Sequence, residues 1–351
     1  MAETTKTQNT TSEQLVNTVL TSIDKERERE IIARRFGLFE RKETLEQIGE
    51  TLGITRERVR QLEKSVMTKF KSSSKQGKIS PDLLNFESKV IDILQQEGNI
   101  SRISTLASKL VNDPDREEQS RVAFLAQLCP SLIFISEDDN YYNSVGVAKA
   151  FEGKNLKDTV EKLVDTIKAI GEPKTIKEIA KAANMTDISE AEALAGISKH
   201  LATLNGLWGL IKWPMVNPKN IRDKIYVILS ENHRHMHFNE IAAAIKQSDF
   251  KRRDVTTQAI HNELIKDKRF VLIGRGIYAL KEWGYEKGTV ADIITNVLQE
   301  AKEPLHRDEI VKRVLKNRFV KETTILLNLQ GKPQFKRVAK ATYTLAQSES
   351  D

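Results

Sequence analysis

The chain has 351 residues, of which 39% are apolar and 30% are charged, and its formal net charge is +7. This length predicts two to four domains rather than one core. No apolar run approaches the roughly eighteen residues needed to cross a bilayer, and residues 1–12 lack the regions of a signal peptide, so we expect a cytoplasmic protein without a membrane partner. The lone cysteine, Cys129, excludes an internal disulfide framework and a cysteine-based zinc finger, and we interpret it as a small core residue.

Residues 1–21 are expected to be disordered, and a helix, a tight turn and a second helix are predicted for residues 44–70. Thr44 and Gln47 fit a capping box, Gly53 ends the first helix and Thr55 starts the second. On a helical wheel of about 100° per residue, two opposed arcs of the second helix separate. The apolar arc holds Val59, Leu62, Val66 and Phe70, and the polar arc holds Arg56, Glu57, Arg60, Gln61 and Lys64.

The polar arc combines side chains that can read bases with side chains that bind phosphates. Arginine can pair with guanine, glutamate can accept from cytosine, glutamine can pair with adenine, and lysine supplies charge. The pattern therefore favours a DNA-reading helix. The alternative is a solvated helix face, which is what most charged runs are.

The segment 22–72 closely resembles region 4 of the bacterial primary sigma factors, the helix-turn-helix that reads the promoter −35 element. The resemblance extends upstream through Glu28-Arg29-Glu30, Ile31-Ile32 and the run from Arg34 to Leu38. It implies that Arg56, Glu57, Arg60 and Gln61 contact −35 bases and adjacent phosphates, and that Arg58 and Lys64 lie nearer the backbone. With Thr55, these residues form the candidate DNA-binding set, and RNA polymerase core is the implied protein partner.

Positive charge is concentrated at the end of this segment. Between Arg56 and Lys78 there are eight basic residues and two acidic ones, a balance that suits a polyanion. The stretch from Ser72 to Ser80 then loses apolar periodicity, and residues 73–82 are predicted to be a flexible linker.

Beyond the linker the chain repeats itself weakly, in units that span residues 83–150, 155–216, 219–285 and 288–345, before a tail at 346–351. Each unit has an apolar helix, a shorter helix and a third helix, and all but the second add two short strands, which is the order of a winged helix-turn-helix. The expected fold class is therefore mainly α: a helix-turn-helix domain followed by an array of winged helix-turn-helix units with small β-hairpin wings.

The hairpins share one spacing, because an aromatic residue precedes a tyrosine by eight positions in three of the units. The pairs are Phe134 and Tyr142, Phe270 and Tyr278, and Phe335 and Tyr343. In the first unit the strands are predicted at Leu132–Ser136 and Tyr141–Val145. The second unit fits least well, with Trp208 and Trp213 where the wing belongs, and is predicted to have a degenerate wing.

The third unit, from His237 to Tyr285, carries Phe238, Glu240-Ile241-Ala242, Asn262-Glu263-Leu264 and Gly274-Arg275-Gly276 followed by Tyr278. It resembles the HARE-HTH winged-helix domain, which the delta subunit of Gram-positive RNA polymerase shares with some restriction enzymes and chromatin proteins. Both glycines beside Arg275 are expected to supply positive φ and to present the arginine at the wing tip. The fourth unit is a looser version, and Ala339-Lys340-Ala341 leaves its turn type open.

A second candidate DNA-binding set lies in this third unit. Lys251, Arg252 and Arg253 precede a helix predicted near Val255–Ile265, whose outer face carries Gln258, His261 and Asn262. Two interpretations stay open: a second DNA-reading helix, or a solvated helix on a protein-docking module. The candidate residues are Arg252, Arg253, Gln258, His261 and Arg275.

His233, His235 and His237 invite a metal hypothesis, but no Cys, Asp or Glu stands at ligand spacing within the run. His237 aligns with His306 at the start of the equivalent helix of the next unit, which indicates a structural position. No metal site is predicted. Because no nucleophile elbow, phosphate loop or paired-carboxylate pattern occurs, we also expect no enzymatic activity, no cofactor and no small-molecule substrate.

These features predict a sequence-specific DNA-binding transcription factor of the sigma type, nucleoid-associated, with duplex DNA carrying a −35-like element and RNA polymerase core as partners. Sigma region 2, which opens the −10 element, has no counterpart in the sequence, so the protein is expected to bind promoter DNA without melting it. Two alternatives are a delta-like accessory protein of RNA polymerase with secondary DNA contact, and a DNA-recognition subunit of a restriction-type system.

Overall fold

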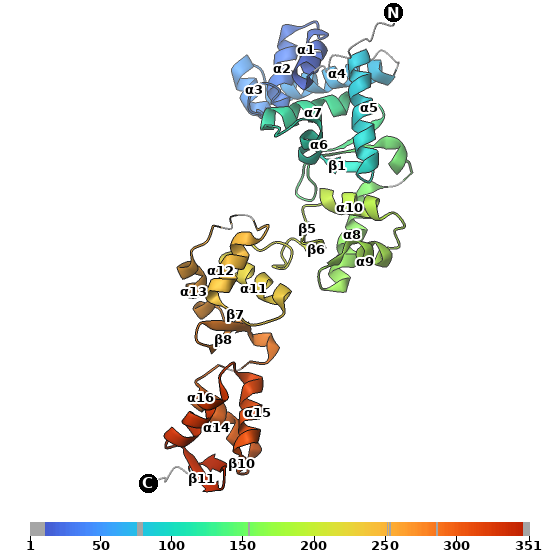
Figure 1. The fold of residues 1–351 in the computed structure, drawn as a ribbon. Coiled ribbons are helices and arrows are strands. Elements are labelled where there is room, and N and C mark those ends of the chain that lie inside the picture. Colours follow the sequence, from blue (N-terminus) through green and yellow to red (C-terminus); the bar gives the residue numbers. More distant parts are fainter. Residues whose placement is uncertain are drawn as a thin grey trace, which may run out of the picture. The chain divides into compact units, whose positions relative to one another are not determined.

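The computed structural model describes residues 11–75, 80–153, 155–250, 252, 254–285 and 287–346. The chain divides into two compact units, Met1–Lys212 and Trp213–Asp351, which are described separately (Figure 1). Helices dominate both units, and small three-stranded antiparallel sheets follow them in the repeats. The expected fold class is confirmed.

Four helices open the first unit: α1 (Ser12–Thr21), α2 (Glu26–Phe36), α3 (Leu45–Leu52) and α4 (Arg56–Lys75). The prediction of disorder for residues 1–21 is wrong for residues 11–21, and residues 1–10 lie outside the described part of the chain. Thr11 caps α1 in a reciprocal box with Gln14, and the helix buries Leu15, Val16 and Val19. Apolar residues one and four positions apart give α1 a stripe that can pack against a neighbour.

The predicted linker is shorter than expected. Helix α4 continues to Lys75, so residues 72–75 are helical, because serine and lysine are tolerated in a helix and the first glycine of the stretch is Gly77. Residues 76–79 lie outside the described residues. Ser80 then caps α5 by accepting a hydrogen bond from Leu83 N, with Pro81 in the first turn.

The first repeat has the expected order, with one correction to its strands. Its elements are α5 (Pro81–Gln96), β1 (Ile100–Arg102), α6 (Ile103–Leu110), α7 (Arg116–Leu128), β2 (Leu132–Ile135), β3 (Ser144–Val147) and the short η1 (Ala148–Phe151). Leu132 pairs with Val147 as Phe270 pairs with Leu280 in the third repeat. Tyr142 therefore lies in the hairpin loop, which is longer here, and is not the counterpart of Tyr278.

The wing of the second repeat is complete, so the prediction of a degenerate wing is wrong. Asn205 (φ 50°) and Gly206 (φ 77°) form a two-residue turn with both residues left-handed, as tight hairpins prefer. Trp208 faces Thr203 across the hairpin. The elements are α8 (Leu156–Ile170), β4 (Lys174–Thr175), α9 (Ile176–Ala182), α10 (Ile188–Ile197), β5 (Leu201–Leu204) and β6 (Leu207–Leu210).

The unit Trp213–Asp351 contains the third and fourth repeats. The third has α11 (Ile221–Asn232), β7 (Met236–His237), α12 (Phe238–Gln247), α13 (Thr257–Lys266), β8 (Phe270–Gly274), β9 (Ile277–Leu280) and η2 (Lys281–Trp283). The fourth has α14 (Val290–Ala301), β10 (Leu305–His306), α15 (Arg307–Asn317), α16 (Glu322–Gly331), β11 (Phe335–Ala339) and β12 (Thr342–Leu345). In both sheets the last strand lies in the centre.

The wing turns of these two repeats are of one type. Gly276 has φ 69°, whereas Gly274 ends β8 without a positive φ, so only one of the two glycines beside Arg275 has the expected conformation. Ala341 takes the place of Gly276 with φ 55°. Both hairpins also shift register just before the turn, at Leu272/Gly274 and at Arg337/Ala339. The fourth wing therefore keeps the turn without either glycine.

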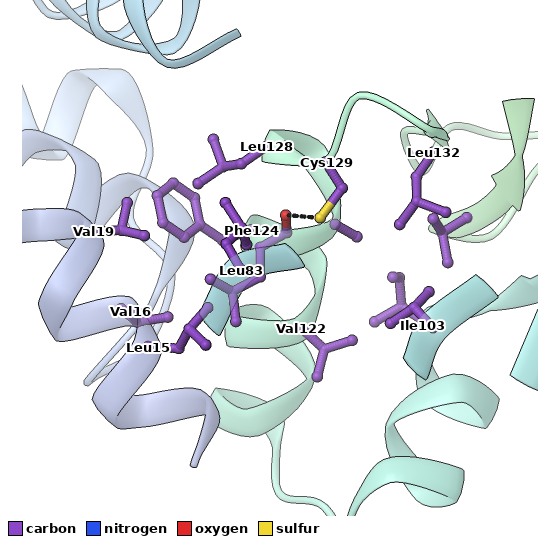
Figure 2. Packing of buried hydrophobic residues seen from close by; sticks show 14 of the residues in the cluster. Leu15, Val16, Val19, Leu83, Ile103, Val122, Phe124, Leu128, Cys129 and Leu132 are labelled. Atoms are coloured by element: carbon purple, nitrogen blue, oxygen red, sulfur yellow. Dashed lines mark hydrogen bonds between the residues drawn. The ribbon is translucent and has the colours of Figure 1, made fainter. Parts of the chain in front are cut away.

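The N-terminal helices and the first repeat share one hydrophobic core. Figure 2 shows Leu15, Val16 and Val19 of α1 on one side of α7, with Ile103 and Leu132 on its other side. Cys129 is buried in this core, as predicted, and its thiol lies 3.3 Å from Leu125 O. Burial raises the pKa of this thiol.

In the part of the chain that the structure describes, no helix is both long enough and apolar enough to span a membrane.

Candidate DNA-binding interface

A small core fixes α2, α3 and α4 as a helix-turn-helix. Ile31, Ile48 and Val59, one from each helix, are completely buried against one another. A Cβ on Gly49 would lie 2.7 Å from Ile54 O, so the turn requires glycine at this position. Gly53 closes α3 in the left-handed conformation, with φ 64°. This packing leaves the start of α4 facing solvent.

The first three turns of α4 carry the candidate set. Thr55 Oγ1 accepts a hydrogen bond from Arg58 N at 3.2 Å, which caps the helix. On the opposite face Val59 and Val66 are buried, which fits the apolar arc of the sequence. All seven residues of the predicted set are exposed: Thr55, Arg56, Glu57, Arg58, Arg60, Gln61 and Lys64.

Within this set, side chains are bonded to one another. The Arg60 guanidinium donates to both Glu57 carboxylate oxygens, at 2.7 and 2.8 Å. These bonds lower the pKa of Glu57 and raise the pKa of Arg60, so both groups are charged at neutral pH. Arg58 Nη1 lies 3.4 Å from Gln61 Oε1. Because such exposed ion pairs are weak in water, Arg60 can exchange Glu57 for a phosphate without a large penalty.

Glu46 is a neighbour of the site that the sequence did not reveal. Its carboxylate on α3 lies 4.0 Å from Arg56 Nη1. The contact depends on the angle between the two helices, and no spacing in the sequence encodes it. Both side chains are largely exposed, so the pair is weak and leaves Arg56 available to another partner.

The candidate set in the third repeat is only partly assembled. Gln258 donates to Asn262 at 3.1 Å on the exposed face of α13, and Arg275 is exposed at the wing turn. His261 differs from expectation, because it is half-buried with its ring 4.9 Å from that of Phe238. Arg252 is exposed, and its carbonyl accepts from Lys224 Nζ at 2.7 Å. Lys251 and Arg253 lie outside the described residues.

The histidine run has structural roles. His233 ends α11 with φ 49°, and His237 caps α12, with Glu240 completing the capping box. His306 caps α15 in the same way, accepting from Asp308 N at 3.4 Å. The predicted equivalence of His237 and His306 is confirmed.

Residues 25–72 thus fold as a helix-turn-helix with an exposed, polar second helix, which is the structure of a DNA-binding domain. The family model described as Sigma-70, region 4 matches these same residues, 25–72. The match covers α2, α3 and every candidate residue of α4, so this segment is a region 4 domain. The HARE-HTH resemblance of the third repeat stays a prediction.

Proposed function

We propose that this protein is a sequence-specific transcription factor that reads a −35-like promoter element through α4 and acts in transcription initiation or its regulation. The observation that carries the proposal is the polar set at the start of α4, every member of which is exposed, within a segment that matches Sigma-70 region 4. In helix-turn-helix proteins the second helix enters the major groove and its N-terminal residues meet the base edges.

The roles follow from position and chemistry. Arg56 and Glu57 stand in the first turn, where a fork onto guanine and an acceptor for cytosine can reach base edges. Arg60 and Gln61 follow one turn later, and Lys64 one turn beyond that, where a point charge serves the phosphate backbone. RNA polymerase core is the proposed protein partner, since region 4 belongs to proteins that act with it. We also propose that the protein is not an enzyme.

A binding selection from random duplexes with the purified full chain, in the absence of polymerase, tests this function. The wild type should enrich one motif. The double variant Arg56→Ala, Glu57→Ala should lose it, whereas Lys64→Ala, which removes a phosphate contact, should keep the motif with uniformly weaker binding. Recovery of an unchanged motif by the double variant would show that α4 is not the reading helix.

The alternative is a polymerase-associated accessory protein, and the third helices of the first two repeats favour it. Helix α7 is packed between the N-terminal helices and its own sheet, and α10 is packed against the first repeat, so neither can enter a groove. These repeats are therefore available for spacing or for protein contact. Chromatin immunoprecipitation with polymerase tracked in parallel separates the two functions, because an accessory protein follows polymerase along transcribed regions, whereas a promoter reader stays at its motif.

A further inference from the structure

The third helix of each winged repeat can read DNA only if its outer face is free, and in the first two repeats it is not. Phe124 of α7 packs 5.0 Å from the ring of Phe36 in α2, and Arg121 donates to Leu38 O at 2.9 Å. In the second repeat, Ile197 O at the end of α10 accepts from Tyr142 N at 3.0 Å. A Cβ on Gly98 would lie only 2.2 Å from Ser189 O of the same helix, so the two repeats touch closely.

The fourth repeat presents its third helix differently. Helix α16 buries only Ile325 and Leu329, and Leu327 on its outer side is 68% exposed. Thr323 and Thr324 are exposed at its start. The face that would meet a groove is thus free within the described part of the unit Trp213–Asp351, and it combines hydroxyls with one apolar side chain, a mixture suited to base edges and thymine methyl groups.

The hairpin that follows α16 along the chain supplies positive charge. Lys336, Arg337 and Lys340 are exposed on β11 and at its turn. From residue 323 to residue 348 the sequence has four basic residues and no acidic one. The equivalent stretch of the third repeat, residues 258–283, has five basic residues and three acidic ones. This stretch of the fourth repeat therefore carries positive charge without an acidic residue, although Glu322 precedes it at the start of α16.

The two sheets also differ on their outer faces. In the third repeat Val271, Ile273 and Ala279 are completely buried there, under Trp283 and Tyr285. The equivalent positions of the fourth repeat, by strand register, are Lys336, Val338 and Thr344. Lys336 is exposed and Val338 is 48% exposed. The last sheet therefore turns Lys336 and Val338 to solvent where its neighbour uses an apolar face for internal packing.

We propose that α16 and the β11–β12 hairpin form a second surface for duplex DNA. Lys336, Arg337 and Lys340 neutralise backbone phosphates, and the exposed face of α16 with Thr324 and Leu327 lies toward the groove. This surface belongs to the unit Trp213–Asp351 and does not depend on α4. It adds affinity and salt dependence to DNA binding. It does not change the preferred motif, since phosphate contacts carry no sequence information of their own.

The test compares two triple variants of the full chain that change charge equally. One is Lys336→Glu, Arg337→Glu, Lys340→Glu. Its matched control is Lys162→Glu, Lys177→Glu, Lys181→Glu, which reverses three exposed lysines of α8 and α9. Affinity for a short duplex is measured against salt concentration by fluorescence anisotropy. A third variant, with glutamine at 336, 337 and 340, keeps side-chain bulk and guards against misfolding of the hairpin.

The hairpin variant should flatten the slope of log affinity against log salt by about 2 to 3, and weaken binding roughly tenfold or more near 0.1 M salt, because three phosphate contacts are lost. The glutamine variant should show the same change in slope, and the control should keep the wild-type slope. The motif selected through α4 should be unchanged, so failure here is distinguishable from failure of the proposed function. Equal slopes for hairpin variant and control would overturn the proposal. Unchanged DNA binding with loss of polymerase association would assign the surface to a protein instead.

Discussion

At the residue scale, Ala341 marks a backbone position that prefers glycine. Its φ of 55° is the left-handed conformation that Gly276 adopts at the same turn of the third repeat. A residue with a Cβ loses about 1 to 2 kcal/mol in this conformation, and glycine avoids that penalty while losing some chain entropy. The fourth wing therefore carries local strain.

We expect Ala341→Gly to stabilise the unit Trp213–Asp351 by about 1 kcal/mol, which is a rise of a few degrees in the midpoint of thermal unfolding. Differential scanning calorimetry on the full chain measures it. Ala339→Gly is the control, since Ala339 lies in β11 without a positive φ, and it should stabilise nothing. If both variants moved the midpoint equally, the strain would not reside at Ala341.

Periodicity predicted the exposure of the α4 candidate set, because a helix of known phase fixes which side chains share a face. It could not predict the contact of Arg56 with Glu46, which depends on the crossing of α3 and α4. It also placed His261 on the outer face of α13, whereas the ring packs against Phe238. For residues near the edge of an arc on the helical wheel, burial is set by tertiary neighbours rather than by position along the helix.

At the element scale, α7 holds two parts of the chain together. It lies between α1 and the first sheet (Figure 2). Its Arg121 donates a hydrogen bond to the backbone carbonyl of Leu38, just beyond α2. Phe124 is completely buried and touches Phe36. The region 4 helices are therefore stabilised by a helix that lies outside the matched segment.

Phe124→Ala should lower the free energy of unfolding by about 3 to 5 kcal/mol, because it leaves a cavity in this shared core. Amide hydrogen exchange followed by mass spectrometry should show faster exchange in both α2 and α5. Leu163→Ala is the control: Leu163 is buried in α8 of the second repeat, and its loss should leave α2 protected. Protection of α2 that survived Phe124→Ala would mean that the N-terminal helices fold independently of the first repeat.

Several elements were predictable and others were not, for physical reasons. Capping boxes and apolar stripes located α3 and α4. The same signals at Thr11 and Gln14 mark α1, which was nevertheless expected to be disordered. The Asn205-Gly206 turn is a strong hairpin signal that two tryptophans obscured. Tyr142 lies in the hairpin loop instead of in a strand because this loop is longer than in the third repeat. Equal spacing in the sequence does not ensure equal strand register.

At the scale of the whole molecule, the division into a region 4 segment and four repeats followed from the sequence, but their coupling did not. A flexible linker was expected after residue 72, whereas α4 continues to Lys75 and Val66 joins the core that α7 completes. A fragment ending at residue 80 would expose Phe36 and Val66. Such long-range packing leaves no periodic trace, so experiments on the N-terminal helices need the first repeat as well.

The central claim is that α4 reads bases, and a cycle between protein and DNA tests it most directly. Wild type and Arg56→Ala, as full chains, are titrated with the preferred duplex and with duplexes that each change one base pair. At one position, the base change and the Arg56→Ala variant should each weaken the free energy of binding by about 1 to 3 kcal/mol. The two changes combined should weaken it no more than either change alone, because they remove the same contact. If every base change cost the variant as much as the wild type, Arg56 would touch no base and the account would be contradicted.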